Sequence, residues 1–169
     1  MRAAAALFVT LLLVGCAAEV PVVEAPSMYA DMAASGARLD AAAAATMISQ
    51  YRQNNGLGTV EVDPELMRLA EAQSQVMADK NKLDHDVRAP LAKRLTGAGY
   101  QANVAVENVS AGYHTLAEAF SGWRDSPPHK ANMLKGGVTK IGIAASYAPN
   151  TKYKVFWTMI LAAPDKKPS

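Results

Sequence analysis

The chain has 169 residues, enough for one domain with a buried core and too few for two comfortable ones. Seventeen lysines and arginines stand against fifteen aspartates and glutamates, so the formal net charge at pH 7 is only +2. This near neutrality argues against nucleic acid or a broad anionic surface as the partner. A single cysteine excludes any internal disulfide, so the fold depends on its core.

The first fifteen residues have the pattern of a secretory signal peptide. Arg2 supplies the basic start, and residues 3–14 form an uncharged apolar stretch. That stretch is too short to cross a bilayer, which takes about 20 residues. It ends in Leu13-Val14-Gly15-Cys16, which resembles the signal of bacterial lipoproteins, where the cysteine becomes the lipidated first residue. An ordinary signal peptide with a chance cysteine is the alternative.

The lipoprotein resemblance implies a membrane anchor on Cys16 and a place in the bacterial cell envelope, facing the periplasm or the cell exterior. Ala17, rather than aspartate, follows the cysteine, which in a Gram-negative cell favours the outer membrane. Residues 16–37 contain prolines with small and acidic residues and show no steady periodicity. We interpret them as the lipidated N-terminus and a flexible tether.

Two amphipathic helices are predicted next. Apolar residues recur at helical spacing over residues 38–55, with Asp40 placed to cap the start and Gly56 to close the end. Asp63-Pro64 then provides a cap followed by proline at the first helical position. An apolar stripe runs from Leu66 to Met77, and core packing is its simplest interpretation.

The second half of the chain alternates short helices and strands. Thr115 and Glu118 form a capping box that opens a helix to about residue 124. Short helices are also predicted over 90–98 and 126–134, and alternating apolar residues predict strands over 103–113, 140–147 and 153–162. This order favours an α+β fold with helices on a small central antiparallel sheet, covering residues 38–163 and leaving 164–169 as a loose tail.

Glu107 lies in a strand-like apolar run, where an unpaired ionised carboxylate is costly. Histidines are natural partners, because a nearby carboxylate raises the imidazole pKa and orients the ring. His85 lies in a loop between two helical stretches, and His129 lies in the first turn of a short helix. We therefore expect these three side chains to meet in one cleft. His114, beside the capping box, is interpreted as an exposed loop residue.

Three motifs follow one another along the chain: Leu83-Asp84-His85-Asp86, then Glu107-Asn108-Val109, then Trp123-Arg-Asp-Ser126-Pro-Pro-His129-Lys-Ala-Asn132-Met-Leu134. Together with Arg94 and the element order, they resemble the CAP superfamily of cysteine-rich secretory, antigen 5 and pathogenesis-related-1 proteins, in its bacterial form. The resemblance implies an α-β-α three-layer sandwich with a cleft lined by histidines and acidic residues. It assigns to that cleft His85, Glu107, His129, Asn108, Ser126 and Asn132.

The chain also departs from the family pattern. Animal and plant members carry a second glutamate on the tryptophan-bearing helix and a second histidine on a later strand. Here the glutamate position falls at Ser126, and the later histidine has no counterpart. His129 matches only the bacterial Ser-Pro-Gly-His-Arg pattern, with Pro128 and Lys130 replacing glycine and arginine. Activities of the eukaryotic branch therefore transfer poorly to this chain.

Three interpretations of the cleft stay open. His85, Glu107 and His129 are possible ligands of a divalent metal, zinc or calcium, although no tight ligand spacing supports this. Glu107 or a histidine is a possible general base for hydrolysis, with Ser110 or Ser126 as nucleophile, although neither serine stands in a nucleophile elbow. In the third interpretation, the side chains form a buried structural network and a ligand binds in the adjacent groove.

The resulting functional hypothesis is a lipid-anchored CAP-domain protein whose His/Glu-lined cleft binds a lipid or another envelope component. One alternative is a metal-assisted hydrolase acting on peptide or peptidoglycan. The other is an envelope scaffold that acts through its surface. The sequence alone does not decide whether the protein is an enzyme.

Overall fold

A computed structural model describes residues 25–165. The predicted signal peptide, the lipidation site at Cys16 and residues 166–169 of the predicted tail lie outside the described residues. The elements follow in the order η1 (Ser27–Tyr29), α1 (Ala41–Gln53), β1 (Glu61–Val62), α2 (Pro64–Asp79), α3 (Leu91–Gly97), β2 (Ala102–Ala111), α4 (Leu116–Asp125), α5 (Pro127–Met133), β3 (Lys140–Ala148) and β4 (Lys154–Pro164).

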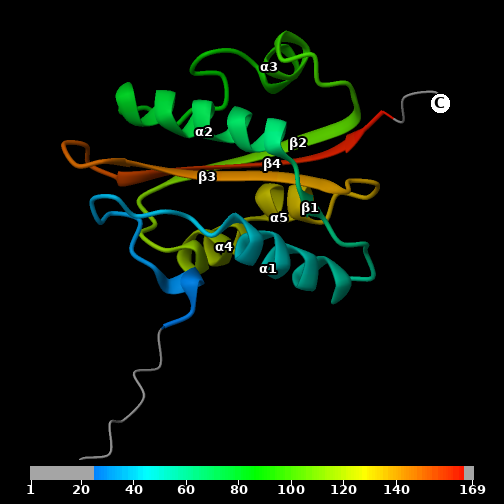
Figure 1. Ribbon diagram of the computed structural model, residues 1–169, viewed down its shortest axis with the longest axis horizontal. Helices are drawn as coiled ribbons and strands as arrows, with labels where there is room; N and C mark the ends of the chain where they lie inside the picture. The colour runs from blue at the N-terminus through cyan, green and yellow to red at the C-terminus, as the bar shows by residue number, and fades with distance from the viewer. Residues whose placement is uncertain (1–24, 166–169) are drawn as a thin grey trace, which may run out of the picture.

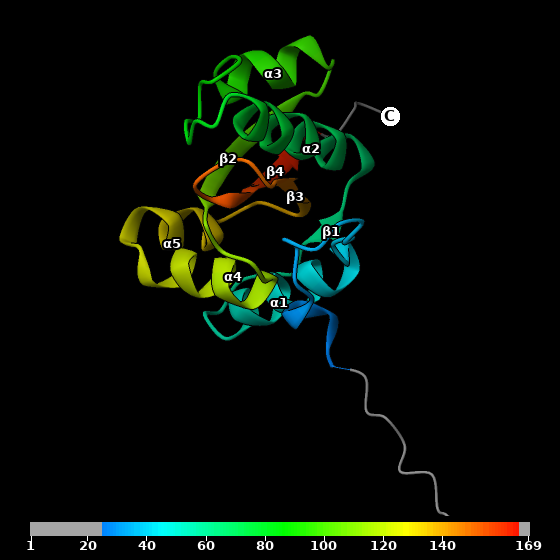
Figure 2. The ribbon, with the colours of Figure 1, turned by 90° about the vertical axis from the view of Figure 1, so that its left-hand side faces the viewer.

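The predicted three-layer α-β-α architecture is confirmed (Figure 1). Helices α2 and α3 cover one face of the sheet, and α1, α4 and α5 cover the other. Figure 2 shows the same three layers from the side, with the four strands between the two sets of helices.

The sheet has the strand order β1-β3-β4-β2, and it is mixed rather than antiparallel. β3 pairs antiparallel with β4, as does β2, but β1 pairs parallel with β3, with Glu61 opposite Lys140. The prediction of an antiparallel sheet is therefore wrong at this edge. β1 has only two residues, which is too short for alternating hydrophobicity to reveal it.

The helix starts follow the predicted caps. The Asp40 carboxylate accepts the backbone N–H of Ala43 at 2.9 Å, and both halves of the capping box between Thr115 and Glu118 are present. Asp63 caps α2 in the same way, with proline at the first helical position. Such caps satisfy backbone N–H groups that have no partner inside the helix.

The core lies on both faces of β4, the strand between β3 and β2. Every residue of β4 from 155 to 162 is buried, and Trp123 and Trp157 are fully buried, as their apolar positions predicted. α2 packs directly on β3, since a Cβ added at Gly142 would lie 2.1 Å from the carbonyl carbon of Leu66. Glycine is therefore needed where the helix backbone approaches the sheet.

Arg52 joins the end of α1 to the loop before β3. The residue is 1% exposed, and its guanidinium donates to four backbone carbonyls, those of Gly58, Met133, Lys135 and Val138. Burial lowers the pKa of this guanidinium. An arginine can satisfy several carbonyls at once because its donors are fixed in one plane, so Arg52 holds three chain segments together.

The N-terminal side of the domain extends further than predicted. Part of the predicted tether packs on the domain: Met32 is 5% exposed and donates its N–H to the carbonyl of His114 at 2.7 Å. Two methionines in a polar, proline-containing stretch were not enough to indicate this packing. Between residues 25 and 165, no helix combines the length and the apolar character needed to cross a membrane.

Candidate functional site

The site around Glu107 is built on β2, the strand at one edge of the sheet. Successive side chains of a strand point to opposite faces. Glu107 therefore turns toward α3 and the His85 loop, whereas Asn108 turns toward α5, as the contacts of each side chain show. The Glu107 side chain is 3% exposed, so both carboxylate oxygens require partners within the protein.

Both carboxylate oxygens of Glu107 are hydrogen-bonded. Nδ1 of His85 lies 2.9 Å from Oε1, and Arg94 donates from Nη2 to Oε2 at 2.6 Å. The His85 loop is held by Gln73, whose amide donates to the carbonyls of Asp84 and His85 at 3.0 Å each. The predicted pairing of the buried acid with an imidazole is thus present, together with a cation that the prediction did not include.

On the other face of β2, two asparagines tie α5 to the strand. Asn132 donates to the backbone carbonyl of Glu107 and to Oδ1 of Asn108, both at 2.9 Å. Asn108 donates in turn to the carbonyl of His129 at 3.0 Å. These bonds satisfy backbone groups at a sheet edge, which otherwise lacks partners.

The two predicted site histidines lie in different electrostatic environments. The hydrogen bond to Glu107 raises the pKa of His85 above its ordinary value of 6.5, with burial opposing the shift. Burial lowers the pKa of His129, and the positive charge of His85 lowers it further. Of the two histidines, His85 is the one that contacts the Glu107 carboxylate, whereas His129 is tied to the strand through its backbone carbonyl.

The side chains present do not fit a His₂Glu metal site. Such a site needs carboxylate oxygens that can face the ion, but both oxygens of Glu107 are engaged and one of them faces the Arg94 guanidinium. Within residues 25–165, no group of three or more His, Cys, Asp or Glu side chains is placed to hold a metal ion. The structure thus gives no support to the zinc or calcium interpretation.

The serines proposed as nucleophiles also lack the surroundings for catalysis. Ser126 is the residue before α5, and its hydroxyl makes no capping bond to that helix. Ser110 is buried in β2, and its hydroxyl has no hydrogen-bond partner within residues 25–165. In the described part of the chain, neither serine is hydrogen-bonded to the base that activates a serine nucleophile.

Arg94 was named from the sequence only as a residue that matches the family pattern. It was not predicted to pair with Glu107. Its side chain is 7% exposed, and besides Glu107 it donates from Nε to the carbonyl of Ala89 at 2.9 Å. The signal was present: a buried carboxylate needs a cationic partner, and an arginine in the short helix just before the strand is a natural candidate.

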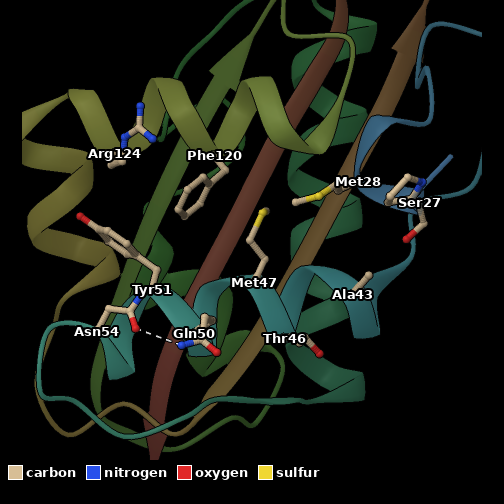
Figure 3. A pocket seen from close by; sticks show the side chains of 11 residues that line it. Ser27, Met28, Ala43, Thr46, Met47, Gln50, Tyr51, Asn54, Phe120 and Arg124 are labelled. Atoms are coloured by element: carbon tan, nitrogen blue, oxygen red, sulfur yellow. Dashed lines mark hydrogen bonds between the residues drawn. The ribbon is translucent and has the colours of Figure 1, made fainter.

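A second region, an apolar pocket, lies between α1, α4 and η1 (Figure 3). Its volume is about 600 Å³, and its lining residues are Pro26, Ser27, Met28, Ala43, Thr46, Met47, Gln50, Tyr51, Asn54, Phe120 and Arg124. The rings of Tyr51 and Phe120 pack edge to face, with 5.4 Å between the ring centroids. None of the six residues assigned to the cleft from the sequence lines this pocket.

Comparison with known proteins settles the family. The profile of the Cysteine-rich secretory protein family (CAP) matches residues 45–161, most of the described domain. The chain belongs to the CAP family. A relative, YkwD of Bacillus subtilis, is described as an uncharacterized protein and is 34% identical over 95 residues, which is 54% of this chain and 37% of YkwD. The chain therefore spans well under half of that relative's length.

Several solved structures share the fold. An extracellular protein containing an SCP domain from Bacillus anthracis superposes with a TM-score of 0.63 at 24% identity, covering 72% of this chain and 39% of that one. An outer surface protein of Borrelia burgdorferi gives a TM-score of 0.67 at 18% identity, covering 75% of this chain and 93% of that one. At these identities the likeness supports the fold alone.

Proposed function

We propose that the protein is a lipid-anchored binding protein of the cell envelope that holds an amphipathic ligand, with an acyl chain and a polar head, in the apolar pocket between α1, α4 and η1. The observation that carries the proposal is the pocket lining. Met28, Met47 and Phe120 expose apolar surface to a space of about 600 Å³. Ligand pockets have volumes of about 300–1,000 Å³ and mostly apolar linings with a few polar groups.

Arg124, the cationic side chain of the lining, lies at one end of the pocket together with Tyr51 and Asn54. In Figure 3, Tyr51, Asn54 and Arg124 lie on one side, and Met47 and Met28 lie on the other. An acyl chain placed against the methionines would direct its head group toward the Arg124 guanidinium. Methionine suits such a lining because its unbranched, polarisable side chain adapts to ligand shape.

The position of the pocket agrees with the predicted anchor. Pro26, the first pocket residue in the chain, follows Cys16 by ten residues, and ten residues span at most about 35 Å. A lipid on Cys16 would therefore keep the pocket mouth within about one bilayer thickness of the membrane surface. Two of the structural relatives are described as extracellular or outer surface proteins, which supports the same side of the membrane for this chain.

The experiment that tests this function is titration of the full chain with hexadecanoic acid, followed by fluorescence or calorimetry. Ala43→Phe places a ring in the pocket, whereas Ala42→Phe places the same ring on the exposed side of the same helix. We expect saturable binding for the unmodified chain and for Ala42→Phe, and at least roughly tenfold weaker binding for Ala43→Phe. Absence of saturable binding, or equal affinity of the two variants, would overturn the proposal.

A further inference from the structure

A smaller cavity lies between α2 and α3, on the face of the sheet opposite the apolar pocket. Its volume is about 240 Å³, below the usual range for drug-sized ligands. Four of its lining side chains, Arg68, Arg88, Lys93 and Arg94, are cationic, and none of the lining side chains is acidic. Arg94 and Gln73 of the Glu107 site contribute to its lining, whereas none of its lining residues belongs to the pocket proposed for the acyl ligand.

Arg94, one of the lining residues, has an unpaired donor. Its Nε and Nη2 are held by the carbonyl of Ala89 and the carboxylate of Glu107, so the guanidinium plane is fixed. Nη1 is buried and has no hydrogen-bond partner within residues 25–165. A buried charged donor without an acceptor is costly, and a bound anion would remove that cost.

Gln73, another lining residue, has an unpaired acceptor. The residue is 1% exposed, and its Nε2 donates to the carbonyls of Asp84 and His85, which fixes the orientation of the amide. Its Oε1 is buried and has no donor among the described residues. The cavity therefore offers a fixed cationic donor together with a fixed neutral acceptor.

The mouth of the cavity adds further positive charge. Arg88 and Lys93 border it and form no salt bridge within residues 25–165. Arg68 pairs with Glu65, which lies outside the lining. Two cations at the mouth and one guanidinium inside suit a small dianion.

We propose that this cavity binds a phosphate group accompanied by a hydroxyl, either the hydrogen phosphate ion or the phosphate monoester of a polyol. The anionic oxygens would accept hydrogen bonds from Arg94 Nη1 and from Lys93 or Arg88, and the hydroxyl would donate to Gln73 Oε1. Sulfate at pH 7 carries the same charge without a hydroxyl, so it would leave the Gln73 acceptor unpaired. This inference goes beyond the proposed function and does not depend on it.

The test is isothermal calorimetry of the full chain at pH 7 and constant ionic strength, with inorganic phosphate, glycerol 3-phosphate and sulfate as separate probes. We expect one saturable site for phosphate and about fivefold weaker binding of sulfate, the value of one neutral hydrogen bond. Lys93→Gln should weaken phosphate binding about tenfold. Lys135→Gln, the same charge change at an exposed position after α5, should leave it unchanged.

The titrations with inorganic phosphate and glycerol 3-phosphate also distinguish the two sources of the phosphate group. Tighter binding of glycerol 3-phosphate would support the proposal with an ester as the ligand, and tighter binding of inorganic phosphate would support it with the free ion. Absence of saturable binding of both, or affinity for sulfate equal to that for phosphate, would overturn it. Equal weakening by Lys93→Gln and Lys135→Gln would also overturn it, because overall charge would then explain the binding.

Discussion

The cluster around Glu107 and the pocket beside α1 hold their side chains in opposite ways. In the cluster, Arg94 and His85 occupy both oxygens of a carboxylate that is 3% exposed. In the pocket, Met28, Met47 and Phe120 are only partly buried, and they border an open space. In the first region both carboxylate oxygens already have partners, whereas the second exposes apolar surface that a ligand can cover.

This difference bears on which region is the better candidate for the proposed ligand site. The polar cluster joins the His85 loop, α3, β2 and α5 through hydrogen bonds, so its effect is to fix the sheet edge. A ligand entering it would have to displace partners that a buried charge needs. A ligand that enters the pocket displaces no partner of a buried charge. The comparison therefore favours a structural role for the cluster and a binding role for the pocket.

The largest effect is expected when the cluster loses its cation. Arg94→Met leaves the Glu107 carboxylate buried without its strongest partner, and breaking a buried pair costs about 3–5 kcal/mol of unfolding free energy. The matched change Arg68→Met removes a solvent-exposed pair with Glu65 and should lower the unfolding free energy far less. Denaturant unfolding measures both values. Similar losses in the two variants would contradict a structural role for the cluster.

The next largest effect concerns the pocket. Hexadecanoic acid at about 100 times its Kd should stabilise the folded chain by about 2.7 kcal/mol, because it binds the folded state alone. Thermal unfolding with and without the acid measures this shift. In Ala43→Phe the stabilisation should disappear, since the added ring takes up pocket volume. An equal shift in the unmodified chain and in Ala43→Phe would place the acid elsewhere.

A smaller loss is expected when the asparagine bridge to α5 is removed. Asn132→Ala leaves the carbonyl of Glu107 and the amide oxygen of Asn108 without their donor, which costs about 1–3 kcal/mol. Asn103→Ala changes an exposed side chain of the same strand and should lie within about 0.5 kcal/mol of the unmodified chain. Equal effects on chemical unfolding would show that the bridge does not stabilise the edge.

The smallest effect is a pH dependence from the two histidines. Because the folded state raises the pKa of His85 above 6.5, its protonation stabilises the fold at acid pH, and this gain is lost as pH rises through the folded pKa. The lowered pKa of His129 acts in the opposite direction, so its contribution is lost as pH falls below 6.5. Imidazole NMR should give a higher pKa for His85 than for His129.

The variant His85→Gln tests whether the charge of His85 lowers the pKa of His129. It removes the positive charge that lowers the pKa of His129, so the His129 pKa should rise toward 6.5 in the variant. An unchanged His129 titration would mean that the two rings do not interact.

Local features could be predicted from the sequence, because neighbouring residues decide them. The caps at Asp40 and Asp63 and the Thr115 capping box each require only a few adjacent residues, and all three are confirmed. The pairing of Glu107 with a histidine also followed from one principle, the cost of a buried charge. The lipid on Cys16 stays a prediction, because the described residues begin after it.

Features that depend on how distant segments dock could not be predicted in the same way. Arg94 reaches Glu107 only because α3 lies over β2. The parallel strand β1 has only two residues, and it forms by pairing with β3, which lies almost 80 residues further along the chain. The apolar stripe of α1 indicated a buried face, with Met47 and Tyr51 on it. The stripe could not show that α4 and η1 leave a pocket there instead of closing over it.

The most direct test of the account locates the bound acyl chain. The full chain would carry ¹³C-methyl methionine and ¹⁵N-labelled histidine and be titrated with hexadecanoic acid, with methyl and imidazole signals followed together. The account predicts saturable shifts of the Met28 and Met47 methyl signals, with the His85 and His129 ring signals unchanged. Shifts of the imidazole signals with unchanged methyl signals would contradict it and return ligand binding to the Glu107 cluster.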